Sequence, residues 1–252
     1  MSETKIPEKA FKNQAFLASE EARPIRILSE YFEPLYRLAE HKVNSTILFF
    51  GSTQANPDKR ASALSRYYWE AEELAFLLTN WAIGLKPKGK NFVICTGGGP
   101  GIMEAGNRGA QRAGGKSIGM NISIPLEQSA NRYISPELGF IFHYFFMRKF
   151  WLVVKAKAII AFPGGFGTLD EIFETITLTQ VGKIPKKEMT ILLYGEEYWR
   201  QLINFDTLIR YGAISPEDMQ LITFSSSPKD AFDFLRKRLL ATLPAGNVGE
   251  SG

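Results

Sequence analysis

Two glycine-rich segments of the sequence have the composition of phosphate-binding loops. The first is 96–101 (TGGGPG) and the second is 163–168 (PGGFGT). Each follows a short apolar run and precedes a segment with helical spacing, so each is expected to turn from the carboxyl end of a strand into a helix. A helix N-terminus offers unpaired N–H groups and the positive end of the helix dipole, and glycines let an anion approach the backbone. The two segments therefore predict a site for a phosphate.

The first segment fits neither of the common nucleotide-binding motifs. Ile102 stands where the dinucleotide-binding motif has its third glycine, and no Gly-Lys-Ser or Gly-Lys-Thr follows as in a P-loop. A simpler explanation is a turn that packs a strand tightly against a helix. Three consecutive glycines, Gly97, Gly98 and Gly99, exceed what such a turn requires, so phosphate binding is favoured.

The second segment has an alternative, purely structural explanation. Thr168 could cap the helix, with Glu171 three residues later completing a capping box. Taken alone, these two residues favour the cap. The three glycines ahead of Thr168, which are Gly164, Gly165 and Gly167, favour a ligand site instead.

Short apolar runs without alternation predict strands that are covered on both faces. They lie at 46–50, 92–95, 117–121, 140–146, 158–162, 189–194 and 221–224. Segments with helical spacing alternate with them, at 25–41, 61–82, 102–113, 147–154, 169–180, 196–209 and 230–242. Pro34 is a candidate break in the first of these helices. The alternation predicts an α/β protein with a Rossmann-like open parallel sheet and helices on both faces.

This order of elements predicts one nucleotide-binding domain, 46–243, after a helical extension, 1–45, and before a disordered tail, 244–252. The composition is 45% apolar and 22% charged over 252 residues, as in globular proteins, and the net charge of +4 includes no long basic block that would indicate nucleic acid. The stretch 140–162 is apolar but carries four basic residues, and the N-terminus lacks the apolar core of a signal peptide. We therefore expect a cytoplasmic protein without a membrane span.

Cysteine and histidine are too scarce for several kinds of site. The single cysteine, Cys95, excludes an internal disulfide and a cysteine-based zinc site, and two histidines exclude a three-histidine metal site. We expect Cys95 to be inert packing and His143 to be a core histidine. The aromatic run 140–151 is expected to divide between the core and a dimer face.

The segments 96–110 (TGGGPGIMEAGNRGA) and 163–171 (PGGFGTLDE) resemble the LOG family, Rossmann-like phosphoribohydrolases that activate cytokinins and are often labelled lysine decarboxylase-like. The segments 121–133 and 145–151 resemble its longer bacterial members, so that the resemblance spans about 46–195. It implies hydrolysis of a nucleoside 5′-monophosphate, of the AMP or cytokinin riboside type, to free base and ribose 5-phosphate. It also implies a homodimer that needs neither cofactor nor metal.

The resemblance implies Arg148 and Glu171 as the catalytic pair. A carboxylate suits this chemistry, because cleavage of a ribosyl C–N bond passes through an oxocarbenium-like state that negative charge stabilises. One departure is the absence of an arginine after the first strand, where 51–54 reads Gly-Ser-Thr-Gln instead of Gly-Ser-Ala-Arg. The candidate substrate-binding residues are Ser52, Gly97, Gly98, Gly99, Glu104, Lys149, Gly164, Gly165, Gly167, Thr168 and Glu174.

Two other functions remain as alternatives. The first is a nucleotide sensor or carrier without catalysis, because phosphate loops alone do not require an enzyme. The second is a pyridoxal-dependent lysine decarboxylase, which needs a Schiff-base lysine beside a partner for the pyridinium nitrogen. The pair His41-Lys42 precedes the first strand and lacks that context, so this second alternative is disfavoured.

Overall fold

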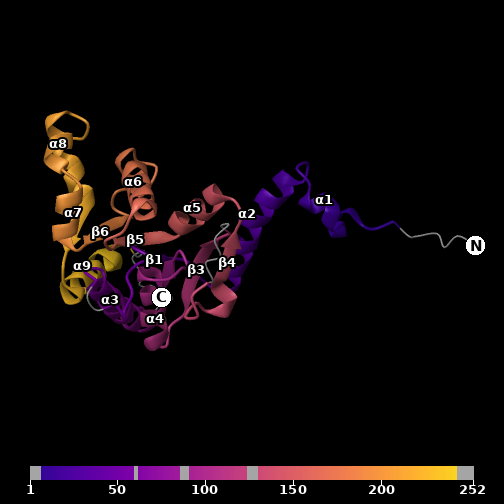
Figure 1. The fold of residues 1–252 in the computed structure, drawn as a ribbon, viewed down its shortest axis with the longest axis horizontal. Helices are drawn as coiled ribbons and strands as arrows, with labels where there is room; N and C mark the ends of the chain where they lie inside the picture. Colours follow the sequence, from indigo (N-terminus) through magenta and orange to yellow (C-terminus); the bar gives the residue numbers. More distant parts are fainter. Residues whose placement is uncertain (1–6, 60–61, 86–90, 124–129, 243–252) are drawn as a thin grey trace, which may run out of the picture.

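The computed structural model describes residues 7–59, 62–85, 91–123 and 130–242. Its centre is a seven-stranded sheet in the order β4-β3-β2-β1-β5-β6-β7, and every neighbouring pair is parallel (Figure 1). The strands are β1 Thr46–Phe50, β2 Val93–Thr96, β3 Ser117–Ile122, β4 Gly139–Phe142, β5 Ala156–Ala161, β6 Thr190–Tyr194 and β7 Ile222–Ser225. The predicted open parallel α/β sheet is confirmed.

Helices cover both faces of the sheet, as the unbroken apolar runs of the strands require. The helices are α1 Gln14–Ala18, α2 Arg23–Glu40, α3 Ser65–Ile83, α4 Ile102–Arg112, α5 Phe145–Val154, α6 Phe166–Gln180, α7 Glu196–Leu202, α8 Phe205–Arg210 and α9 Pro228–Ala241. Successive side chains of β1 point to opposite faces of the sheet and so belong to different cores. Ile47 and Phe49 pack in one core with α3, α4 and α9, whereas Leu48 and Phe50 pack in another core with α5 and the end of α2.

The predicted elements differ from the observed ones mainly at their ends. The expected strand 140–146 stops at Phe142, because the following aromatic residues begin α5. The expected helix 196–209 divides into α7 and α8, and Asn204 begins the second by accepting a hydrogen bond from the Thr207 N–H at 2.9 Å. The predicted tail, 244–252, lies outside the described residues.

Pro34 does not break the first long helix. Proline lacks the N–H that would bond the carbonyl of Glu30, four residues earlier. The indole Nε1–H of Trp151 on α5 donates to that carbonyl at 3.0 Å, so the carbonyl keeps a hydrogen-bond partner. The Glu30 carboxylate also accepts the backbone N–H groups of His143 and Tyr144. Glu30 therefore fixes α2 against the β4–α5 connection.

The apolar stripe of α2 faces outward. Ile25, Leu28, Phe32 and Leu35 have the predicted helical spacing, but each is at least 38% exposed, and only Leu38 is buried. Figure 1 shows α1 and the start of α2 projecting beyond the β4 edge of the sheet. The predicted helix 25–41 is thus confirmed by α2, while its apolar stripe finds no partner among the described residues.

Two smaller expectations have different outcomes. Cys95 is buried, as expected, and burial raises the pKa of its thiol to about 12. His143 is exposed, so the prediction of a core histidine is wrong; its backbone, not its ring, makes the contact with Glu30. In the part of the chain that the structure describes, no helix has the length and apolarity to cross a bilayer.

Candidate functional site

The strand order places a cleft between β1 and β5, where the chain reverses its direction across the sheet. Ligands of open α/β sheets bind at such a point, outside the carboxyl ends of the strands. Ser52 follows β1 there and joins the two glycine loops. Its N–H donates to the Pro163 carbonyl at 3.0 Å, and its carbonyl accepts the N–H of Ile102 at 3.1 Å. The backbone of Ser52 therefore holds both loops together at the carboxyl ends of the strands.

Two glycines make this close approach of the loops feasible. Gly101 has a φ of +71°, and a Cβ there would collide with the backbone of Ser52 and Thr53. A Cβ on Gly164 would collide with the side chain of Thr168 and lie 2.9 Å from the Ser52 nitrogen. The Gly164 carbonyl also accepts a hydrogen bond from the Tyr198 hydroxyl at 2.8 Å. Gly164 is therefore required by packing within the loop.

The N-terminus of α6 points into the cleft. Gly165 is the N-cap residue and provides no side-chain cap. A Cβ on Gly165 or Gly167 would meet nothing within 4 Å, so both glycines face open space. Within the described residues, no carbonyl accepts from the N–H of Gly165 or Gly167. These N–H groups, at the positive end of a 15-residue helix, are suited to an anion.

The capping-box interpretation of Thr168 and Glu171 is wrong. The helix begins at Phe166, three residues earlier than that interpretation requires. The N–H of Thr168 donates to the Gly165 carbonyl at 3.0 Å and not to the Glu171 side chain. Because Glu171 lies in the second turn, its carboxylate is directed to the cavity beside Arg148 instead of the helix end.

A cavity of about 380 Å³ occupies the cleft. It brings together six of the predicted site residues, and adds apolar and amide side chains that the sequence did not single out. The predicted residues are Ser52, Arg148, Gly165, Gly167, Thr168 and Glu171, and the additional ones include Gln54, Met103, Ile122, Phe145 and Phe166. The cavity therefore combines a helix N-terminus, a cation, a carboxylate and an apolar wall.

Arg148 extends from α5 across the carboxyl end of β3. Its Nε donates to the Met120 carbonyl at 2.8 Å, and its Nη1 lies 3.9 Å from Oε1 of Glu171. Burial lowers the pKa of the guanidinium, and the Glu171 carboxylate partly offsets this effect. A Cβ on Gly97 would lie 2.5 Å from Nη2 of Arg148. Gly97 therefore makes room for the arginine.

Glu171 is a buried carboxylate whose charge is only partly compensated. Its side chain is 5% exposed, and its Oε2 has no hydrogen-bond partner among the described residues. Burial raises the pKa of the carboxyl to about 7, against the opposing effect of the Arg148 and Lys149 cations. A carboxyl with such a pKa can accept or release a proton near neutral pH.

The other predicted site residues are not among the described residues that line this cavity. Lys149 bridges Asp170 at 2.9 Å and Glu174 at 2.7 Å, on the outer side of α5 and α6. Glu104 accepts a hydrogen bond from the Tyr68 hydroxyl at 2.7 Å and faces α3. Neither Lys149, Glu174 nor Glu104 is among the described residues that line the cavity.

The triple glycine is buried beneath the cavity. The Gly98 N–H donates to the Thr96 hydroxyl at 2.9 Å, and the amide of Asn131 donates to the carbonyls of Gly98 and Gly99, both at 3.1 Å. These bonds use the Gly98 N–H and two carbonyls, whereas no described backbone carbonyl accepts the N–H of Gly97 or Gly99. Asn131 lies in the segment 121–133 and was not predicted as a site residue. The only sequence feature that could have indicated it is a polar residue in the connection that follows a strand.

The parallel sheet, with a cavity at its reversal point, defines an α/β protein of the Rossmann-like class. Residues 103–235, just over half of the chain, match the model of the family described as "Possible lysine decarboxylase". The chain belongs to this family, and the resemblance to LOG proteins is confirmed.

Curated plant proteins are among the relatives. The chain is 29% identical to the "Probable cytokinin riboside 5'-monophosphate phosphoribohydrolase LOGL3" of Oryza sativa subsp. japonica over 201 residues, 79% of this chain and 86% of that protein. It is also 29% identical to LOGL5 of the same organism, named as the same probable activity, over 73% of this chain and 68% of that one. LOG1 of Arabidopsis thaliana is 39% identical, but only over 84 residues, a third of this chain.

Solved structures share the fold. The structural-genomics protein TM1055 superposes with a TM-score of 0.51 at 19% identity, covering 77% of this chain and 99% of that one. The Moco carrier protein from Chlamydomonas reinhardtii gives a TM-score of 0.50 at 19% identity, covering 79% and 99%. At this identity the likeness establishes the fold alone.

Proposed function

We propose that the protein hydrolyses the N-glycosidic bond of a nucleoside 5′-monophosphate, of the AMP or cytokinin riboside type, to free base and ribose 5-phosphate. The observation that carries the proposal is the buried Arg148–Glu171 pair beside the open N-terminus of α6. The activities for which the plant relatives are named support the same reaction.

The phosphate is assigned to the first turn of α6. The N–H groups of Gly165 and Gly167 and the hydroxyl of Thr168 face the cavity, and the helix dipole favours a negative charge there. The Ser52 hydroxyl lines the same cavity and accepts the Gln54 N–H at 3.0 Å, which leaves its own proton for the ligand. These groups fix one end of the substrate.

Glu171 is assigned to the reacting end. As a carboxylate it stabilises the cationic ribosyl centre and takes a proton from the attacking water, whose oxygen bonds to C1′ while the C–N bond breaks. The electron pair of that bond leaves with the base, which is then protonated. Arg148 favours the ionised form of Glu171 against the effect of burial, and a hydrogen bond to the Met120 carbonyl fixes the arginine itself to β3.

The base is assigned to the apolar wall. Phe145 and Phe166 both line the cavity and are 49% and 92% exposed, so their rings are available to stack on a planar ligand. Gln54 stands beside them, and its amide can both donate and accept hydrogen bonds.

The cavity does not fit a pyridoxal cofactor. A Schiff base requires a lysine amine, and none of the described residues lining the cavity is a lysine. Lys149 is the nearest candidate in the sequence, but its ammonium is bound by two carboxylates outside the cavity. The residues of this site therefore do not support a pyridoxal-dependent decarboxylation of lysine.

A nucleotide carrier or sensor on the same scaffold is the alternative. A pure carrier of an anionic nucleotide has no use for a buried carboxylate, because that charge repels the ligand and costs desolvation energy. Glu171 therefore favours the enzyme.

The decisive experiment is incubation with AMP and with other nucleoside monophosphates, followed by chromatography for free base. We expect AMP to be cleaved on the order of 100-fold faster than adenosine, because the phosphate site contributes to binding only when the phosphate is present. Equal rates on the two substrates would remove the basis of the site assignment. Tight AMP binding with no release of base would indicate the carrier.

We further propose that two copies of the chain pair through α2 and α5. Leu28 and Phe32 on α2 are 53% and 57% exposed, and Phe146 and Phe150 continue this apolar surface on α5. Light scattering should give twice the chain mass, and Phe32→Glu should shift the protein toward the monomer. Tyr211→Glu, at an aromatic residue after α8 that is 79% exposed, is the control. A parent protein that is already monomeric would contradict the pairing.

A further inference from the structure

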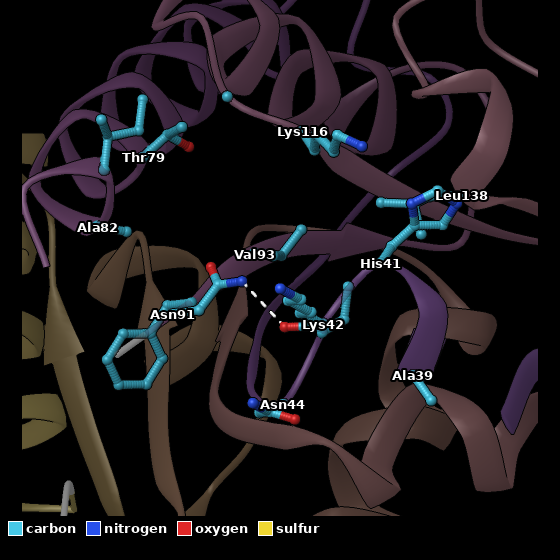
Figure 2. Close-up of a pocket in the computed structure, with 14 residues that line it drawn as sticks. Ala39, His41, Lys42, Asn44, Thr79, Ala82, Asn91, Val93, Lys116 and Leu138 are labelled. Carbon is cyan, nitrogen blue, oxygen red and sulfur yellow. Dashed lines mark hydrogen bonds between the residues drawn. The ribbon is translucent and has the colours of Figure 1, made fainter. Parts of the chain in front are cut away.

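A second cavity, of about 560 Å³, lies at the amino ends of the strands, opposite the carboxyl ends where the first cavity lies (Figure 2). It is formed around the amino ends of β1, β2 and β3, by the turn after α2, the end of α3 and the turn before β3. The catalytic cavity lies beyond the carboxyl end of β1. Because β1 has five residues, the two cavities are separated by roughly 17 Å of strand.

Three basic residues line this cavity: His41, Lys42 and Lys116. Lys42 and Lys116 approach it from different elements, the α2–β1 turn and the α4–β3 turn, as Figure 2 shows. The ammonium of Lys116 pairs with Glu137 at 2.6 Å, which occupies one of its three N–H donors and leaves two. The cavity is thus suited to a negatively charged ligand.

Lys42 occupies a position that favours glycine. It has a φ of +56° and is the only non-glycine residue with a positive φ among those described. Its N–H donates to Ala39 and the next N–H, of Val43, donates to Leu38, so α2 ends in a Schellman motif with Lys42 at the left-handed position. The fold therefore carries a lysine side chain at a site where its backbone conformation is disfavoured.

Two residues that line the cavity each have a buried side-chain oxygen without a hydrogen-bond partner among the described residues. These oxygens are Oγ1 of Thr79, a residue that is 6% exposed, and Oδ1 of Asn91. The Asn91 amide nitrogen donates to the Lys42 carbonyl at 3.2 Å, which fixes the orientation of the amide (Figure 2). Native proteins rarely leave buried polar atoms unsatisfied, and a ligand in this cavity that offers hydrogen-bond donors would supply partners for these oxygens.

We propose that this cavity binds a small organic phosphate that carries hydroxyl or amino groups. Its phosphate lies against Lys42, Lys116 and His41, and its donors reach Thr79 and Asn91. Apolar residues such as Val93 and Leu138 also line the cavity. This binding site is separate from the catalytic cavity, and the proposal stands whether or not the protein is a hydrolase.

The two histidines allow a direct test in the intact protein. His41 lines the second cavity, whereas His143 is exposed on the connection between β4 and α5. In a chain labelled with ¹³C-histidine, ribose 5-phosphate should shift the ring signals of His41 saturably and leave those of His143 in place. Inorganic phosphate should do so more weakly, because it brings no hydroxyl donors, and ribose should have no effect. A His41 signal that does not move, or that moves together with His143 without saturation, would overturn the proposal.

Two variants separate binding from folding. Lys42→Gly relieves the left-handed backbone and removes the ammonium, so the protein should remain folded and bind ribose 5-phosphate roughly tenfold more weakly at His41. Thr79→Val keeps the shape but removes the unpartnered hydroxyl. It should not lower the melting temperature, yet should weaken binding about fivefold. Lys237→Ala, at an exposed lysine of α9, is the charge control. Parent-like binding in both cavity variants would contradict the assignment.

Discussion

Arg148 and Glu171 lie side by side without a close hydrogen bond: Nη1 and Oε1 are 3.9 Å apart, and both side chains are largely buried. The two side chains differ in their other contacts. Arg148 is fixed by the Met120 carbonyl, and Oε2 of Glu171 has no partner among the described residues. The carboxylate is therefore held near a positive charge while one of its oxygens remains available, which is the arrangement expected of a group that handles protons or a developing cation.

Substitution of Glu171 tests whether its charge is used in catalysis. Glu171→Gln keeps the size of the side chain and removes the charge that would stabilise the ribosyl cation. We expect a folded protein that still binds AMP and whose turnover falls by on the order of 100-fold or more. Glu188→Gln, at an exposed carboxylate paired with Lys157, is the matched control and should retain the parent rate. If Glu171→Gln keeps most of the turnover, the reacting carboxylate must be sought elsewhere.

The raised pKa of Glu171 predicts how activity depends on pH. Because the ionised form is the reactive one, kcat/KM should rise with pH and level off above about pH 7, the pKa of this carboxyl. A bound phosphate is a nearby negative charge and raises the pKa further, so the inflection in kcat should lie at a higher pH than that in kcat/KM. A rate that is constant between pH 5 and 8 would contradict this role.

The same shift predicts a pH-dependent stability. The folded state binds the Glu171 proton more tightly than the unfolded state does, because the pKa rises from 4.5 to about 7 on folding. The free energy of unfolding should therefore fall as the pH rises from about 4.5 to 7, by up to about 3 kcal/mol from this group. Glu171→Gln removes the effect, so urea denaturation should find the variant gaining stability relative to the parent across this range. A difference independent of pH would count against it.

Substitutions of two neighbouring glycines should have different effects, one on ligand binding and the other on stability. A Cβ at Gly165 meets nothing within 4 Å, so Gly165→Val should fold normally but block the approach of a phosphate to the helix end. A Cβ at Gly164 collides with Thr168, so Gly164→Ala should lower the melting temperature even without ligand. Thermal melts with and without AMP measure both effects. A Gly165→Val protein that AMP stabilises as it does the parent would refute the assignment of the phosphate.

The hydrogen bond from Trp151 to the Glu30 carbonyl can be tested by a double-mutant cycle. Trp151→Phe leaves that carbonyl without a donor and should cost roughly 1–3 kcal/mol beyond the lost packing. Pro34→Ala restores a backbone N–H at the position from which the helix would normally satisfy Glu30. We therefore expect Trp151→Phe to cost less in the Pro34→Ala background than in the parent, as measured by denaturant titration. Additive effects would show that the two donors do not serve the same carbonyl.

The sequence determined the parallel α/β architecture. Apolar runs such as 46–50 and 189–194 are local signals, because a strand covered on both faces is apolar throughout whatever lies far along the chain. The loop 163–168 is equally local, since its glycines and the following helix are contiguous. The family resemblance rested on the same contiguous segments.

The tertiary structure decided which of the candidate groups face the cavity. The carbonyls of Gly98 and Gly99 accept hydrogen bonds from Asn131, a residue more than thirty positions away, so a distant segment sets how the triple glycine is held. The nearby sequence alone explained Glu171 as part of a helix cap. Only the position of Arg148, on another helix, shows that the Glu171 carboxylate lies beside a cation instead. Spacing along a chain specifies which face of a helix a residue occupies, whereas what lies opposite that face depends on packing between distant elements.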